Sequence, residues 1–152
     1  MNWHKCAVLV TGGNGFLGIN LVQRLIEFGV SKIRIIDNLD RQKNFTMYNK
    51  DKGVEFINGD LRDKSLCLEA CKGIDIIFHC ASKVGSIGFY QKFAADILSH
   101  NTTVDTQMLE AARCSNISCY VYISSAFVYP IERMLDPHSP AIKESEVIPA
   151  NP

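Results

Sequence analysis

Short apolar runs alternate along the chain with longer segments in which apolar residues recur at helical spacing. These runs are rich in β-branched side chains and lie at residues 6–10, 33–37, 54–57, 74–79 and 120–123. Such runs are typical of strands that are buried on both faces of a parallel sheet. We therefore predict a strand at each of them.

The segments between these runs have the periodicity of helices. The first ends at Gly29, a suitable C-terminal cap, and the second runs from the cap residue Asp63 to Gly73, whereas the third covers about residues 93–113. Their stripes are Phe16, Leu17, Val22, Leu25 and Ile26, then Leu66, Cys67, Ala70 and Cys71, then Ile97, Asn101, Val104, Met108 and Ala112. Alternating strands and helices predict right-handed βαβ units. The expected fold class is α/β, a Rossmann-type doubly wound parallel sheet.

Composition and charge exclude several classes of function. The 152 residues fit one α/β domain, and 47% hydrophobic with 21% charged residues indicate a packed core rather than disorder. Sixteen basic residues balance sixteen acidic ones, so nucleic acid is not an expected partner. No apolar run approaches the roughly 18 residues of a membrane helix, and the run at residues 6–10 is too short for a signal peptide. A membrane partner is therefore not expected.

The six cysteines contain no C-x-x-C pair, and four lie in apolar stretches, as buried reduced thiols do. This usage predicts a reducing cytoplasm. Zinc is the alternative, because Cys67 and Cys71 could share a helix face. However, His79 and Cys80 are adjacent on a predicted strand and point to opposite faces, so they cannot chelate one ion, and we expect no metal.

A glycine-rich turn joins the first predicted strand to the first predicted helix. Gly12 would permit the tight turn, Gly15 would let the backbone approach a pyrophosphate, and Gly18 would let the helix pack against the strand. The helix N-terminus would offer free amides to the phosphates. Asp37 ends the second strand at about the 20-residue distance expected for a carboxylate that binds an adenosine ribose. A glycine-rich turn with a solvated aspartate is the alternative.

The sequence T-G-G-N-G-F-L-G at 11–18 resembles the extended short-chain dehydrogenase/reductases, and within them the NAD-dependent nucleotide-sugar epimerase/dehydratase family. Further matches follow in order along nearly all of the chain. They are Asp37-Asn38, Gly59-Asp60-Leu61, residues 79–82 (H-C-A-S), Asn101 with residues 109–112 (L-E-A-A), and residues 122–130 (Y-I-S-S-A-F-V-Y-P). Together these motifs are highly specific.

The resemblance implies roles for individual residues. Asp60 and Leu61 would contact the adenine of NAD, Ala81 and Lys83 would lie near the nicotinamide half, and Ser125 would be the catalytic serine. The other implied cofactor-binding positions are Gly12, Gly15, Phe16, Leu17, Gly18, Asp37, Asn38 and Ser124. Local roles are the alternatives: Asp60 could close a turn, Lys83 could be a solvated charge, and Ser125 could cap a strand end.

Residues 84–89 (V-G-S-I-G-F) and 125–130 (S-A-F-V-Y-P) look most like the branch that contains GDP-mannose 3,5-epimerase and GDP-fucose synthase. That branch carries an acid/base cysteine two residues after the catalytic serine, where this chain has Phe127. Phenylalanine cannot transfer a proton, so 3,5-epimerisation by that route is not expected.

The family's Tyr-x-x-x-Lys pair is expected to follow residues 143–152, and the sequence stops before it. Tyr129 is followed four residues later by Arg133, but it belongs to the serine motif and is not accepted as a substitute. We expect residues 1–129 to form an NAD-binding Rossmann domain. Residues 130–152 contain all five prolines and are expected to be a loop leading to the missing catalytic pair, the last strands and a substrate domain.

The resemblance implies a parent enzyme that acts on a nucleoside diphosphate sugar. A tyrosine phenolate would take a hydroxyl proton, hydride would pass to NAD, and a transient keto sugar would form before the hydride returns. A homodimer is expected for the intact enzyme, and the 152-residue chain alone is expected to be inactive. A non-enzymatic NAD-binding regulator is the main alternative. A steroid or flavonoid-type dehydrogenase is a second, which the segment at 84–89 disfavours.

Overall fold

The computed structural model describes residues 2–41, 53–125, 128–130 and 138–146. The chain divides into two compact units, residues 1–122 and residues 123–152, and each is described by itself. The first unit contains every strand found among the described residues. In the second unit, the described residues include the short 3-10 helix η3 (Glu144–Glu146).

The first unit is built on a five-stranded sheet with the order β3-β2-β1-β4-β5, in which every neighbouring pair is parallel. The strands are β1 (Ala7–Thr11), β2 (Lys32–Asp37), β3 (Val54–Asn58), β4 (Ile76–His79) and β5 (Cys119–Tyr122). In the registers on either side of β1, Val10 pairs with Ile35 of β2 and Phe78 of β4. This topology confirms the predicted Rossmann-type fold.

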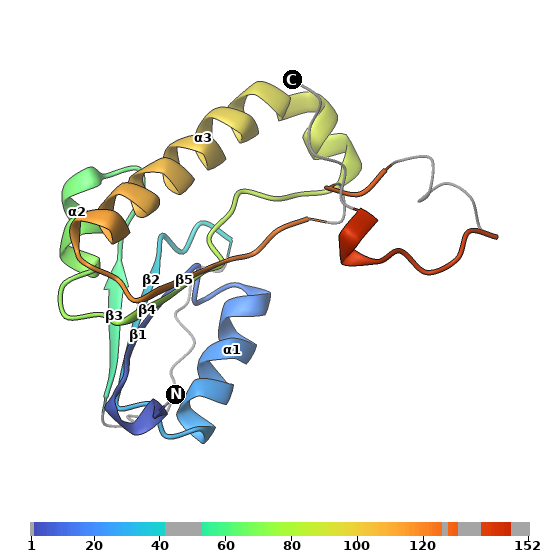
Figure 1. Cartoon of the computed structure of the whole chain (residues 1–152). Helices are drawn as coiled ribbons and strands as arrows, with labels where there is room; N and C mark the ends of the chain where they lie inside the picture. Colours follow the sequence, from blue (N-terminus) through green and yellow to red (C-terminus); the bar gives the residue numbers. More distant parts are fainter. Residues whose placement is uncertain (1, 42–52, 126–127, 131–137, 147–152) are drawn as a thin grey trace. The chain divides into compact units, whose positions relative to one another are not determined.

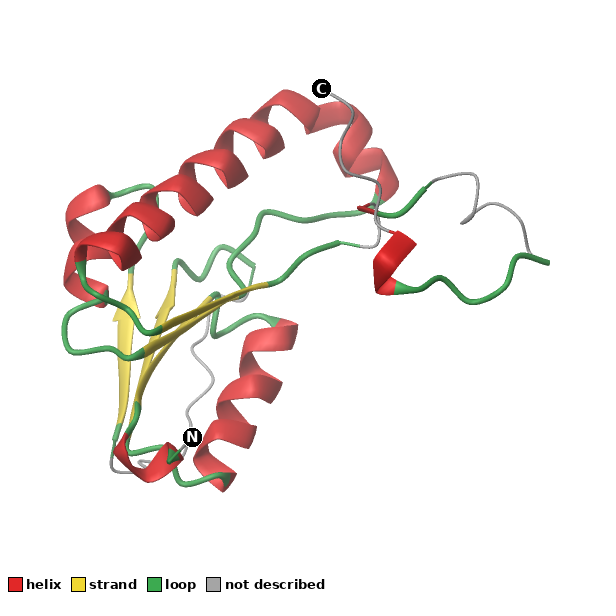
Figure 2. Cartoon of the chain, viewed as in Figure 1, coloured by secondary structure: helices red, strands yellow, loops and turns green. Residues whose placement is uncertain are grey.

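Helices cover both faces of the sheet. They are α1 (Phe16–Glu27), α2 (Lys64–Ala70) and α3 (Ile87–Cys114), preceded by the 3-10 helix η1 (Trp3–Lys5). Helix α1 lies on one face, whereas α2 and α3 lie on the other (Figures 1 and 2). The sheet is therefore doubly wound, and both faces of its central strands are removed from water.

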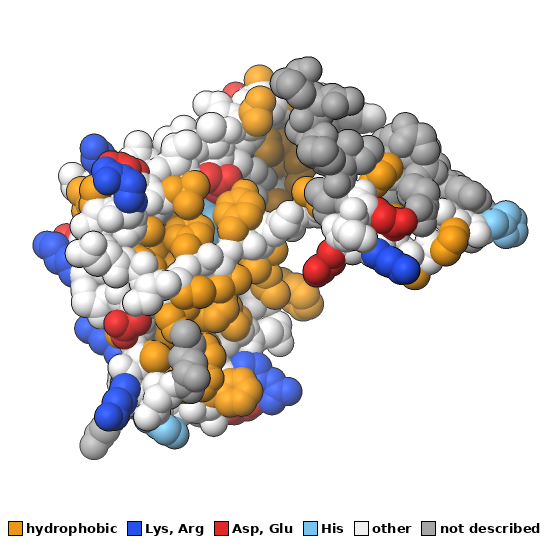
Figure 3. Space-filling model, in the orientation of Figure 1, with side chains coloured by type: hydrophobic (Ala, Val, Ile, Leu, Met, Phe, Trp, Pro, Cys, Tyr) orange, Lys and Arg blue, Asp and Glu red, His pale blue; other side chains and the backbone are white. Residues whose placement is uncertain are grey.

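Alternate side chains of β1 enter different cores. Leu9 packs with Met108 of α3 in one cluster, whereas Val8 and Val10 pack with Val22 of α1 in the other. All five of these side chains are fully buried. The continuous apolar run at residues 6–10 thus reflects burial on two faces. Other apolar side chains remain at the surface, and they gather over the sheet between α3 and α1 on the face seen in Figure 3.

Two predicted helix boundaries are confirmed by their caps. The Asp63 carboxylate accepts the backbone N–H groups of Ser65 and Leu66 at the start of α2. At the end of α1, Gly29 has φ +69°, and its N–H donates to Ile26 while the next N–H, that of Val30, donates to Leu25. This pair of bonds is a Schellman motif, which glycine favours because it adopts positive φ without strain.

The start of α3 differs from the prediction. The helix begins at Ile87, capped by Ser86, rather than near residue 93, so part of the segment at 84–89 is helical. Phe93 interrupts the helix with φ −124° and ψ 28°. Before this kink the helix is mostly exposed, and the buried stripe begins only at Ile97. Periodicity therefore detects only the part of α3 that packs on the sheet.

The cysteines are less buried than their apolar surroundings suggest. Cys67 and Cys71 are fully buried, three others are partly buried, and Cys114 is exposed. All six are free thiols. Burial raises the pKa of Cys67 to about 12 and that of Cys71 to about 11, so both stay protonated at neutral pH. Among the described residues, no helix is long and apolar enough to cross a membrane, and no cluster of potential metal ligands was found.

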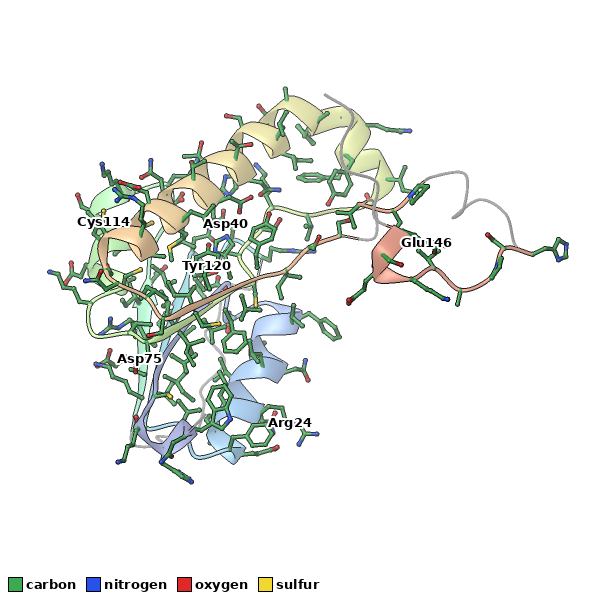
Figure 4. The ribbon with its side chains drawn as sticks, viewed as in Figure 1. Arg24, Asp40, Asp75, Cys114, Tyr120 and Glu146 are labelled. Atoms are coloured by element: carbon green, nitrogen blue, oxygen red, sulfur yellow. The ribbon has the colours of Figure 1, made fainter. Side chains whose placement is uncertain are left out.

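Tyr120 of β5 carries a buried hydroxyl that has no hydrogen-bond partner among the described residues. Its ring lies beneath α3 (Figure 4). We expect Tyr120→Phe to be neutral or to raise the free energy of unfolding by about 1 kcal/mol, since it removes a buried unsatisfied polar group. Urea denaturation measures this change, and a loss of more than about 1 kcal/mol would contradict the assignment.

Candidate functional site

The candidate site lies at the carboxyl ends of the central strands. In the order β3-β2-β1-β4-β5, the chain leaves β1 for one side of the sheet and leaves β4 for the other. A crevice opens outside such a topological switch point, and open α/β sheets bind their ligands there. The two loops that meet at this point begin at Gly12 and at Cys80.

The glycine turn is closely packed. Gly12 has φ +63°, and a Cβ atom added to it would lie 2.8 Å from the Ala81 Cα atom. A Cβ on Gly18 would overlap the Gly12 carbonyl oxygen and the Gly13 Cα atom, and one on Gly13 would overlap the Ile35 side chain. Gly18 therefore lets the start of α1 approach the glycine turn closely. Sequence reasoning gave no role to Gly13, although position 13 also has no room for a larger residue.

Helix α1 begins with amides that no side chain caps. Its N-cap is Gly15, which makes no side-chain hydrogen bond, and Phe16, Leu17 and Gly18 form the first turn. The N–H groups of a first turn lack acceptors within the helix and carry the positive end of its dipole. The Phe16 side chain is 90% exposed and that of Leu17 is 46% exposed. This end of α1 is thus open to an anionic group.

Asp37, at the end of β2, is connected to the glycine turn. One carboxylate oxygen accepts the Asn14 N–H at 3.0 Å, and the other accepts the Leu39 N–H at 2.8 Å. Asn38 follows, and its side chain bonds Asp40. Asp37 is therefore in direct contact with the backbone of the glycine turn. The carboxylate is oriented by two backbone donors.

Asp60 and Leu61 follow β3. The Arg62 guanidinium and backbone N–H bond the Asp60 carboxylate, and this guanidinium holds the pKa of Asp60 below its usual value. The Leu61 side chain is only 5% exposed and belongs to the core beside α2 and α3. Asp60 does close a local turn, since its carbonyl accepts the Asp63 N–H. A ligand at Leu61 would meet backbone atoms rather than the side chain.

The loop after β4 is held by Asn101 of α3. The Asn101 side chain accepts the Lys83 N–H at 2.7 Å and donates to the Lys83 carbonyl at 3.1 Å. Ala81 donates its N–H to the Thr11 hydroxyl and lies against Gly12. The structure therefore brings together Ala81 and the glycine turn, and it explains Asn101 as an anchor for the loop that carries Lys83.

Sequence reasoning missed a polar network beside these loops, centred on the buried side chains of Thr11 and His79. We call it the histidine network, and its four side chains are Thr11, His79, Asp105 and Tyr122. His79 Nδ1 lies 3.0 Å from the Thr11 hydroxyl, and His79 Nε2 lies 3.0 Å from an Asp105 carboxylate oxygen. The other Asp105 oxygen accepts the Tyr122 hydroxyl at 2.9 Å. The one available signal was a histidine in an apolar strand, which we considered as a metal ligand and as part of the motif at residues 79–82 but not as the centre of a polar network.

Ser124 and Ser125 belong to the second unit. Both residues are exposed, and the Ser125 carbonyl accepts the Val128 N–H at 3.2 Å. Their position relative to the glycine turn stays a prediction. Phe127, which replaces the branch's cysteine, lies outside the described residues.

Known proteins resemble both the sequence and the fold. The chain is 34% identical over 148 residues to GDP-mannose 3,5-epimerase 1 of Oryza sativa subsp. japonica, and the match covers 97% of the chain but 38% of that relative. An epimerase from Methanothermobacter thermautotrophicus matches with a TM-score of 0.79 and 27% identity, covering 97% of the chain and 42% of that structure. A UDP-glucose 4-epimerase from Stenotrophomonas maltophila was solved with bound NAD and formylated UDP-arabinopyranose. It matches with a TM-score of 0.70 and 26% identity, covering 82% of the chain and 38% of that structure.

The chain spans about two fifths of the length of these curated relatives. The model of the family described as "NAD dependent epimerase/dehydratase family" matches residues 8–152, which include the glycine turn, Asp37, the loop after β4 and Ser125. The relatives and the family model therefore agree with the resemblance carried by the sequence motifs. On this evidence, the chain belongs to the NAD-dependent epimerase/dehydratase family.

Proposed function

We propose that the carboxyl edge of the sheet binds NAD. The observation that carries this proposal is the contact between Asp37 and the backbone of the glycine turn, which joins the expected ribose and pyrophosphate sites into one surface. The backbone around Gly12 and Gly18 has no room for a Cβ atom and leaves the first amides of α1 accessible. These residues fit a dinucleotide, because its phosphates need amides and its adenosine ribose needs an acceptor.

Each expected residue then has a part in holding the cofactor. Gly12, Gly15, Phe16, Leu17 and Gly18 would hold the pyrophosphate, mainly through backbone amides. Asp37 and Asn38 would hold the adenosine ribose, Asp60 with the backbone of Leu61 would contact the adenine, and Ala81, Lys83 and Ser124 would line the nicotinamide half. NAD, when bound, supplies a hydride acceptor at its nicotinamide ring.

For the whole protein we propose a nucleotide-sugar epimerase or dehydratase that works through a transient keto sugar. Ser125 would hold the reacting sugar hydroxyl, and a tyrosine beyond residue 152 would take its proton. Residues 1–129 would form the NAD-binding domain, and residues 130–152 would lead to that tyrosine and its lysine. Family membership and the match to epimerases support this proposal. No specific observation favours a non-enzymatic regulator.

We further propose a nucleoside diphosphate sugar as substrate, a homodimeric enzyme and a cytoplasmic location. The substrate class is supported by the UDP sugar bound to one structural neighbour. The location is supported by six free thiols, which suit a reducing compartment. Light scattering of the full-length protein would test the dimer, and fractionation of cells that express it would test the location.

We expect NAD to bind the full-length protein at least about tenfold more tightly than NADP. The Asp37 carboxylate would repel a 2′-phosphate on the adenosine ribose, and such like-charge contacts cost over 1 kcal/mol. Asp37→Asn keeps one acceptor for the backbone but removes the charge, so the preference should fall. Calorimetric titration with both dinucleotides measures it.

Asp40→Asn is the matched control, because Asp40 is a carboxylate of the same loop that bonds Asn38 rather than the glycine turn. Its preference for NAD should stay close to that of the wild type. Equal binding of NAD and NADP by the wild-type protein would refute the assignment of Asp37. An equal loss of preference in both variants would assign the preference to the general charge of the loop.

A further inference from the structure

The histidine network ties three strands together where the candidate site begins. Thr11 ends β1, His79 ends β4 and Tyr122 ends β5, while Asp105 comes from the middle of α3. β1 leads into the glycine turn and β4 leads into the loop of Ala81 and Lys83, which are two parts of the candidate site, and β5 is followed along the chain by Ser124 and Ser125. We propose that His79 is a positioning residue that fixes the relative placement of these strand ends for cofactor binding.

The hydrogen bonds around His79 have one consistent direction. The Thr11 hydroxyl oxygen accepts the N–H groups of Cys80 and Ala81 at 3.1 Å each, so its own proton is free to point toward His79 Nδ1. His79 Nε2 then carries the ring proton and donates it to Asp105. This arrangement uses every donor and acceptor of a neutral imidazole.

Burial supports the neutral form. His79 is only 2% exposed, and burial lowers its pKa, although the bond to Asp105 acts in the opposite direction. Its ring also stacks against those of Tyr120 and Tyr122, with centroids 5.7 Å and 5.8 Å away. The imidazole is therefore held by hydrogen bonds at both ring nitrogens and by ring contacts with two tyrosines of β5. A histidine held in this way fixes the ends of the strands relative to α3.

The effect reaches the candidate site in one step. Thr11 and Gly12 are consecutive, and the two amides that bond the Thr11 hydroxyl begin the loop that lies against Gly12. If His79 loses a partner, Thr11 loses its fixed orientation and the Gly12–Ala81 approach loosens. This inference rests on the proposed binding of NAD, because it concerns the placement of the residues proposed to hold that cofactor.

Two substitutions separate the two halves of the network in the full-length protein. His79→Asn keeps an acceptor near Thr11 and loses the bond to Asp105, whereas His79→Gln keeps a donor near Asp105 and loses the bond to Thr11. Each should weaken NAD binding about tenfold, because small misplacements of positioned groups have effects of this order or larger. Tyr122→Phe is the mildest variant, since Tyr122 is about half exposed, and about a threefold loss of NAD affinity is expected.

A double-mutant cycle distinguishes positioning from general support. Tyr122 acts on the site through Asp105 and His79, so Tyr122→Phe should add no further loss in the His79→Asn background. Leu25→Ala is the matched control, because Leu25 is buried in the core on the opposite face of the sheet. It should lower the Tm as the His79 variants do, yet change NAD affinity less than twofold.

Nitrogen-15 NMR of the imidazole gives a readout that does not depend on the cofactor. We expect His79 to be neutral at pH 7 with its proton on Nε2, and a cationic ring or an Nδ1–H tautomer would overturn the inference. If the wild-type protein binds NAD and the His79 variants bind it with the same affinity, the inference is overturned but the proposed function is not. Additive losses in the double-mutant cycle would have the same consequence. Failure of the wild-type protein to bind NAD would overturn the proposed function, and this inference with it.

Discussion

Gly18→Ala is expected to lower NAD affinity of the full-length protein about 100-fold and to destabilise the fold. The added Cβ would overlap the Gly12 carbonyl oxygen and the Gly13 Cα atom. Both are backbone atoms, so no side chain can rotate away and either the turn or α1 must move. Overpacking of this kind costs about 1–3 kcal/mol. The same shift displaces the first amides of α1, which are proposed to bind the pyrophosphate.

Gly88→Ala is the matched control for a glycine substitution in the first turn of a helix. Gly88 lies near the start of α3, and a Cβ atom there would meet nothing within 4 Å. Alanine should raise the free energy of unfolding by up to about 1 kcal/mol, since it favours the helix over the unfolded chain. Urea denaturation and calorimetric titration measure both variants. Wild-type affinity in Gly18→Ala would show that the packing of the turn is not needed for binding.

The fold could be predicted from sequence because each of its strands has a local signal. The run at residues 6–10 is apolar on both faces, as β1 requires, and Asp63 and Gly29 mark helix ends through short-range hydrogen bonds. The first turns of α3 gave no such signal, because they are largely exposed and are separated from the packed part of the helix by the kink at Phe93. Hydrophobic periodicity reports contact with the core, so it cannot detect a helix that extends past the sheet.

The candidate site was predictable only where its parts are close in sequence or have a fixed spacing. The glycine turn and Asp37 have such a spacing, and in the structure a hydrogen bond joins them. The histidine network has none, since its bonds join Thr11 to His79 and His79 to Asp105 across different elements. The Leu61 side chain shows a further limit: the motif identifies a backbone position, while the side chain belongs to the core. Sequence patterns thus identify the turns that bind a ligand better than the side chains that hold those turns in place.

Ser125→Ala is expected to lower kcat of the full-length enzyme about 10²- to 10³-fold, the loss typical of one positioned hydrogen-bond donor. The serine hydroxyl is proposed to hold the sugar hydroxyl, and it has no part in binding the adenosine half of NAD. The affinity for NAD should therefore stay within about twofold of the wild type. Single-turnover kinetics with a panel of UDP and GDP sugars, together with NAD titration, measure the two effects separately.

Ser124→Ala is the matched comparison, because it removes the same hydroxyl from the neighbouring residue, which is also exposed. Ser124 is proposed to line the nicotinamide half, so its loss should weaken NAD binding more than it slows turnover at saturating NAD. Opposite responses in adjacent serines would assign one hydroxyl to the substrate and the other to the cofactor. Equal, small effects on kcat in both variants would mean that Ser125 only caps the strand end, and the proton transfer would then need a different partner for the sugar hydroxyl.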